Sequence, residues 1–170
     1  MPELKPSFPW VYPYQEDGPR LGQVVLRPVV SVALVGPDGV GVLRPTPVMA
    51  LVDSGCEHVL AAPWLADAAG VDPKSSDKTI VLGLGGDNLE VRFLDVKLRL
   101  YPPRSANDDV YVEWEDEVGF LTHWRPTWPV LLGQVGFMRR FTITMSRHSQ
   151  CLAVDDREAF DDRYGVPLAP

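Results

Sequence analysis

The sequence has little of what marks several large classes of protein. It has two cysteines, three histidines and a formal net charge of −7. Proteins that bind nucleic acid usually carry a basic surface, and this acidic balance argues against that class. No stretch approaches the roughly 18 apolar residues that a membrane-spanning helix needs. We therefore expect a chain that binds neither nucleic acid nor a membrane.

The scarcity of cysteine and histidine also limits metal and redox chemistry. A disulfide between Cys56 and Cys151 is one alternative, but their number and spacing favour two free thiols in a reducing compartment. No pair of cysteine or histidine residues has the spacing of a zinc site. Residues 1–14 hold four prolines and no apolar run, unlike a signal peptide. We expect a cytoplasmic protein with no metal and no cofactor.

Glycine and proline are abundant instead, at 14 and 17 of 170 residues. So many residues that interrupt regular structure favour short strands and turns. The best candidate helix is residues 63–69, which Gly70 ends. This predicts an all-β domain over residues 21–154 with one or two short helices. It would follow an extended, aromatic-rich arm at residues 1–20, whose aromatic side chains pack on the domain, and precede an acidic tail at residues 155–170.

One acidic residue has an unusual position. Residues 48–52 are a short continuous apolar run, which predicts a strand buried on both faces, and Asp53 follows directly. Buried strands avoid an unpaired carboxylate because its desolvation is costly. Ser54 and Gly55 suit a tight turn, since glycine tolerates unusual backbone angles and serine bonds to nearby backbone. The pattern holds an acid on a rigid apolar platform, although a plain turn or helix cap is the alternative.

A glycine-rich hairpin is predicted further along the chain. Strands are expected at residues 79–84 and 89–100, with Gly85-Gly86-Asp87-Asn88 as the turn between them. A dinucleotide-binding loop is excluded because a strand, and not a helix, follows the glycines. An ordinary hairpin with no functional role stays an alternative. The glycines in question are Gly83, Gly85 and Gly86.

These segments, in this order, resemble the retropepsin-like aspartic protease family. Ala50-Leu51-Val52-Asp53-Ser54-Gly55-Cys56 is similar to its apolar-apolar-Asp-Thr/Ser-Gly motif, and the glycine-rich hairpin is similar to its flap. Val130-Leu131-Leu132-Gly133 is similar to its second apolar-apolar-Gly motif, which passes beside the catalytic loop. The resemblance covers about residues 26–154 and implies a closed, barrel-like acid-protease fold. It implies a catalytic Asp53, a supporting turn of Ser54 and Gly55, and a second motif of Leu131, Leu132 and Gly133.

The resemblance also implies that one chain holds half of an active site. Aspartic peptidases use two carboxyl groups that share a proton. The chain has one Asp-Ser-Gly, and no other Asp is followed by Ser or Thr and then Gly. We therefore expect a symmetric homodimer that cleaves a peptide or protein substrate, with Asp53 of each copy at the two-fold axis.

Two other interpretations stay open. An inactive peptide-binding or dimerisation module on the same fold would also keep this turn, because fold does not determine function. A nucleophile at Cys56 or Ser54 with His58 as base is disfavoured, since no third group is evident. The chain departs from compact family members in an acidic insertion near residues 108–117, and Gly136 should weaken the short helix expected at residues 134–138.

Overall fold

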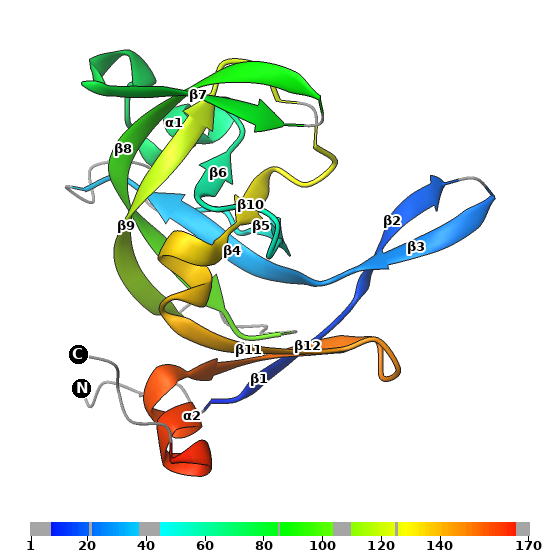
Figure 1. Ribbon diagram of the computed structural model, residues 1–170. Helices are drawn as coiled ribbons and strands as arrows, with labels where there is room; N and C mark the ends of the chain where they lie inside the picture. Colours follow the sequence, from blue (N-terminus) through cyan, green and yellow to red (C-terminus); the bar gives the residue numbers. More distant parts are fainter. Residues whose placement is uncertain are drawn as a thin grey trace.

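A computed structural model of the protein describes residues 8–20, 22–37, 45–84, 86–103, 110–124 and 126–165. Strands account for most of the regular structure (Figure 1). The strands are β1 (Trp10–Pro13), β2 (Gln15–Arg20), β3 (Gln23–Arg27), β4 (Val29–Val35), β5 (Val48–Val52), β6 (Val59–Ala61), β7 (Lys78–Leu84), β8 (Asp87–Tyr101), β9 (Val112–Leu121), β10 (Val130–Leu132), β11 (Phe141–Ser146) and β12 (Cys151–Asp156). The helical elements are α1 (Trp64–Ala69), the 3₁₀ helix η1 (Pro73–Ser75), the π-helical turn η2 (Gln134–Met138) and α2 (Arg157–Tyr164).

Six strands close into a barrel. They pair in the order β4, β5, β10, β6, β9 and β8, and β8 pairs back with β4. Strand β7 joins this sheet as the antiparallel hairpin partner of β8. Closure leaves no free edge among the six strands, which removes the unpaired backbone groups that an open sheet would expose. The predicted all-β, closed barrel-like fold with short helices is confirmed.

The barrel interior is apolar, but β5 is less buried than predicted. Ala50 and Val52 are buried in the main core, while Met49 and Leu51 are partly exposed. Successive side chains of a strand point to opposite faces, so only alternate residues reach the interior. The expectation of burial on both faces is therefore wrong for β5. The three residues of β10, in contrast, are all buried.

Local signals account for two other elements. Helix α1 ends at Gly70, which adopts the left-handed conformation with φ 71°, as predicted. Strands β3 and β4 follow each other directly, with Pro28 between them. Proline has no amide hydrogen for a sheet, so it separates the two pairings.

The acidic segment at the end of the predicted insertion belongs to β9 and is neutralised by its neighbours. Glu113 lies opposite Arg99 on β8, and their charged groups are 2.7 Å apart. Glu117 pairs with Lys78 of β7. Glu113 and Arg99 lie on directly paired strands, while Lys78 reaches Glu117 from the other side of β8, and such opposite charges help an acidic sequence to form a strand.

A second, three-stranded sheet closes one end of the molecule. Strand β1 pairs with β12, and β12 pairs with β11. Trp10 and Tyr12 are buried in the main core, and the Tyr12 hydroxyl donates to the Tyr101 carbonyl at 2.6 Å. Aromatic side chains of the predicted arm thus pack on the domain, as expected, but their backbone forms regular strands.

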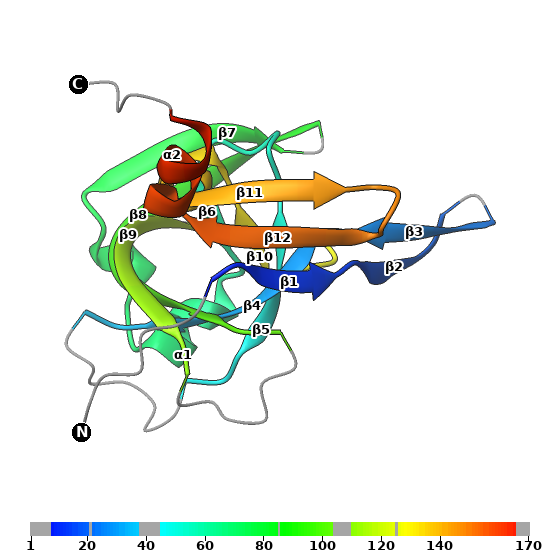
Figure 2. The ribbon, with the colours of Figure 1, turned by 90° about the horizontal axis from the view of Figure 1, so that it is seen from below.

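Strands β2 and β3 form a separate hairpin of residues 15–27, named here the projecting hairpin. It extends away from the body of the molecule in two perpendicular views (Figures 1 and 2). The hairpin of β7 and β8 extends on the same side of the barrel in both views. These two hairpins flank the end of the barrel at which β5 terminates. The last residues of β5 pair with the first residues of β4, and this is where the chain enters β4 from β3.

Candidate active site

Asp53 is held at the end of β5 by backbone hydrogen bonds to strands on both sides. Its amide donates to the carbonyl of Leu132, the last residue of β10, at 3.0 Å. The amide of the preceding residue, Val52, donates to the Pro28 carbonyl at 2.9 Å. The backbone that carries the carboxylate is thus a continuation of a closed barrel, which gives it little freedom to move.

The turn of residues 53–58, named here the Asp53 turn, folds back on the carboxylate. The Gly55 amide donates to Oδ1 of Asp53 at 2.9 Å, and the Cys56 amide donates to the Asp53 carbonyl at 3.1 Å. Asp53 is partly buried, whereas Ser54 and Gly55 are exposed. This backbone donor fixes the orientation of the carboxylate.

The second motif passes directly behind this turn, as the resemblance implied. The amides of Gln134 and Val135 donate to the carbonyls of Cys56 and Glu57 at 2.9 and 2.7 Å. The Gln134 side-chain amide donates to the Ser54 carbonyl at 2.7 Å. These three bonds tie the Asp53 turn to the segment after β10, so the two form one rigid unit.

Gly133 is the point of closest approach between the two segments. A Cβ atom there would lie 2.6 Å from the Cys56 carbonyl oxygen and closer still to that of His58. Real Cβ atoms do not tolerate such contacts with backbone, so only glycine fits. Leu131 and Leu132, the apolar pair before it, are both buried, and they pack in two different core clusters.

The turn η2 follows, and Gly136 disturbs it as the sequence suggested. Val135 and Gly136 have non-helical backbone angles, with φ 99° at Gly136. The carboxyl group of Asp116, on β9, packs against this glycine, and a Cβ there would lie 2.9 Å from its Cγ. Burial raises the pKa of Asp116 above its usual value, although the Glu117 amide, which donates to Oδ1 of this carboxyl group, acts in the opposite direction. The sequence does not single out this residue, because Asp116 is one of four acidic residues in β9.

A pocket of about 220 Å³ opens over the Asp53 turn. The pocket brings three of the predicted site residues together: Asp53 and Gly55 from the turn, and Gly83 from β7. Ser54, Gly86 and the second motif do not line it, and Gly85 lies outside the described residues. The lining residues are Asp53, Gly55, Cys56, Glu57, His58, Leu60, Leu82, Gly83 and Leu121.

The neighbouring thiol is not arranged as a nucleophile. Sγ of Cys56 donates to the carbonyl oxygen of His58 at 3.1 Å, and burial raises the pKa of Cys56. A reactive cysteine needs a lowered pKa and a basic partner. The His58 ring instead packs edge-on against Phe93, with ring centroids 5.0 Å apart. The interpretation of Cys56 as a catalytic nucleophile therefore gains no support.

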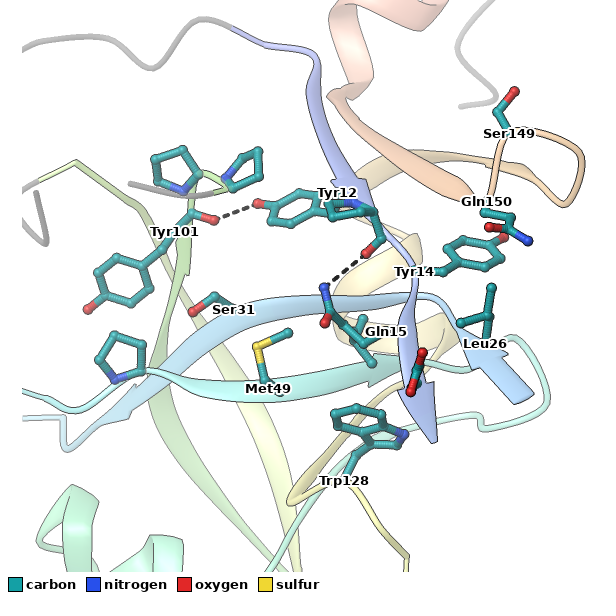
Figure 3. Close-up of a pocket in the computed structure, with 16 residues that line it drawn as sticks. Tyr12, Tyr14, Gln15, Leu26, Ser31, Met49, Tyr101, Trp128, Ser149 and Gln150 are labelled. Atoms are coloured by element: carbon teal, nitrogen blue, oxygen red, sulfur yellow. Dashed lines mark hydrogen bonds between the residues drawn. The ribbon is translucent and has the colours of Figure 1, made fainter. Parts of the chain in front are cut away.

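A larger hollow, of about 1050 Å³, lies elsewhere (Figure 3). Tyr12 and Tyr14 line it from the N-terminal strands, and Met49 and Trp128 line it from the barrel side. No residue of the Asp53 turn reaches it. By volume alone, this hollow would be the first candidate for a functional site. The only titratable residues among the described ones that line it, however, are tyrosines and Glu16. The smaller pocket holds the carboxylate and is the better candidate for catalysis.

The described ranges hold few features of other kinds of site. No group of three or more histidine, cysteine, aspartate or glutamate residues there could hold a metal ion. No helix among the described residues is long and apolar enough to cross a membrane. Cys56 and Cys151 are both free thiols, in agreement with the expectation.

No family model matches the chain, and no curated protein is significantly similar to it. Among solved structures, the chain is similar to a retropepsin-like aspartic protease from Rickettsia conorii. The identity is 10% and the TM-score 0.46, over 89% of this chain and 96% of the other. It is also similar to the retroviral protease-like domain of Ddi1 from Leishmania major. Here the identity is 15% and the TM-score 0.41, over 76% and 94% of the two chains. At these levels the likeness carries no argument about activity.

Proposed function

We propose that this chain is one half of an aspartic endopeptidase, with Asp53 as its catalytic carboxylate. The observation that carries the proposal is the position of Asp53. Its backbone is fixed to the carbonyl of Leu132, and its side chain lines a pocket that Leu82 and Gly83 of the β7–β8 hairpin close from the other side. A rigid carboxylate beneath a glycine-containing hairpin is suited to a peptide held in extended form.

The proposed chemistry uses water and two carboxyl groups. An ionised Asp53 takes a proton from water, and the water oxygen attacks the carbonyl carbon of the scissile peptide bond. A second, protonated carboxyl group polarises the carbonyl oxygen by donating a hydrogen bond to it. Two carboxyl groups that act on the same water and the same peptide bond lie too close together for both to ionise easily. One proton is therefore shared between them.

The second carboxyl group comes from another copy of the chain in this proposal. The sequence has one Asp-Ser-Gly motif, and no other acidic side chain except Glu57 lines the Asp53 pocket. Glu57 is exposed. Ser54 and Gly55 are exposed beside Asp53. A two-fold axis next to this exposed turn would bring the two Asp53 carboxyl groups face to face and would cover both turns.

The test compares two variants with the same loss of charge. Asp53→Asn should abolish cleavage of a peptide library, by at least about a hundredfold, while the dimer persists. Asp95→Asn, on the exposed outer side of β8, is the matched control and should cleave as the wild type does. Wild-type cleavage should also be blocked by pepstatin, which mimics the tetrahedral intermediate.

Two outcomes would contradict the proposal. If Asp53→Asn cleaves as well as the wild type, the catalytic group is elsewhere. If the wild type binds peptides but cleaves none at any pH between about 3 and 7, where a carboxyl pair shares its proton, an inactive binding module is the better description.

A further inference from the structure

The projecting hairpin is the one part of the described chain that is not packed into a larger sheet. Among the described residues, β2 and β3 pair only with each other. The hairpin extends beyond the body of the molecule with no other element beside its outer part (Figures 1 and 2). A two-stranded hairpin alone in water is marginally stable at best, so its order calls for a contact surface.

The base of this hairpin is braced, which sets its direction. Nη1 of Arg147, in the turn between β11 and β12, donates to the Leu26 carbonyl at 3.2 Å. The Tyr14 amide donates to the Gln150 carbonyl in the same turn at 2.8 Å. Asp17 and Arg27 pair across the two strands, with charged atoms 3.3 Å apart. A preorganised element loses less entropy on binding than a flexible one.

The outer part of the hairpin, in contrast, offers an uncovered apolar side chain. Val24 is 60% exposed and lies opposite Pro19 on the other strand. Beneath the base, the hairpin is separated from its own barrel by the large hollow, which Gln15, Glu16 and Leu26 line (Figure 3). The hairpin therefore does not lie down on the barrel from which it emerges.

The hairpin starts next to the candidate catalytic residue. Pro28 joins β3 to β4, and its carbonyl accepts a hydrogen bond from Val52, the residue before Asp53. A strand of this length spans about 20 Å. A second copy that brought its own Asp53 turn to the same point would therefore lie within reach of the hairpin.

We propose that the projecting hairpin is an arm that grips the second copy of this chain. The inference rests on the proposed function, because the need for a second Asp53 is what brings another copy to this face. Specific interfaces take roughly 20 to 30 residues from each partner, far more than the Asp53 turn supplies. No residue of the hairpin lines the Asp53 pocket, in which the peptide substrate would bind. The hairpin is therefore placed to contact the second copy and not the substrate. Two-fold symmetry makes the grip reciprocal, with one arm from each copy.

The test measures the dimer dissociation constant by sedimentation equilibrium for four proteins. Val24→Asp places a charge on the proposed contact and should weaken the dimer by about tenfold or more. Val11→Asp is the matched control, since Val11 is a 50% exposed valine on β1, and it should leave the constant within about twofold. A shortened variant, with residues 18–24 replaced by Asn-Gly, should weaken the dimer further. Circular dichroism confirms that each variant is folded.

The outcomes separate this inference from the proposed function. If the shortened and Val24→Asp variants dimerise as the wild type does, the arm is not a dimer contact, even where the wild type is an active peptidase. If they lose the dimer while the wild type cleaves no peptide, the arm is supported and the peptidase proposal fails. A wild type that is monomeric at every concentration, with and without a bound peptide, overturns both.

Discussion

Gly133 lies directly against the carbonyl oxygens of Cys56 and His58, with no space for a side chain. Gly133→Ala should therefore separate the second motif from the Asp53 turn or strain both. We expect a loss of about 1 to 3 kcal/mol in the free energy of unfolding, the usual cost of overpacking, together with loss of activity. Urea denaturation and peptide cleavage measure the two effects.

Gly83→Ala is the control for this substitution. A Cβ at Gly83 meets nothing within 4 Å, so the free energy of unfolding should change by no more than about 0.5 kcal/mol. Equal destabilisation by the two variants would show that the close approach at Gly133 is not what requires glycine there.

Cys56 offers a test between the aspartic mechanism and a cysteine nucleophile. Cys56→Ala should retain most of the activity, because the thiol is bonded to a backbone carbonyl and its pKa is raised. Removal of a true nucleophile would instead cost several orders of magnitude. Since fewer thiolate ions form when the pKa is raised, iodoacetamide should modify Cys56 more slowly at pH 7 in the folded protein than in denaturant, as followed by mass spectrometry.

Tyr12 connects the N-terminal strand to the barrel through one buried hydrogen bond. Tyr12→Phe removes the donor to the Tyr101 carbonyl and should lower the free energy of unfolding by about 1 kcal/mol. Tyr14→Phe, two residues along, is the matched control and should have less effect, because Tyr14 is only partly buried. A larger loss from Tyr14→Phe than from Tyr12→Phe would contradict this assignment of the bond.

Local chemistry made much of the fold predictable. The stop at Gly70 and the hairpin of β7 and β8 each follow from signals within a few residues. The projecting hairpin was missed, because β2 reads Gln-Glu-Asp-Gly-Pro-Arg and has almost none of the β-branched or aromatic residues that favour strands.

The candidate site likewise has a part that the sequence predicts and a part that it does not. The acid at the end of an apolar strand and the glycine turn after it are local patterns, so the sequence predicts the turn of Asp53, Ser54 and Gly55, and their catalytic role stays a proposal. The contact of Asp116 with Gly136 joins residues 20 positions apart on different elements, and no local pattern encodes it. The packing of the whole core determines which strands become neighbours. The arrangement of the strands then determines which acidic side chain is buried.

Asp116 leads to a prediction about pH. Burial raises its pKa in the folded protein above the ordinary value of 3.8, so folding favours the protonated carboxyl group. The stability that protonation contributes is therefore fully present below about pH 3.8 and is lost as the pH rises through the raised value. Asp116→Asn stays neutral throughout. Relative to the wild type, this variant should become progressively more stable as the pH rises from about 3 to 7.

Urea denaturation at a fixed protein concentration, repeated across this pH range, measures the difference. Asparagine keeps an oxygen that can accept from the Glu117 amide, as Oδ1 of Asp116 does at 2.8 Å, so the variant preserves the local bond. Any constant cost of placing an amide beside Trp114 shifts the whole curve but not its slope. Asp95→Asn, on the exterior of β8, carries the same change of charge and serves as the reference for bulk charge effects. A difference between wild type and Asp116→Asn that stays flat with pH, or moves in the wild type's favour, would show that burial does not raise the pKa of Asp116.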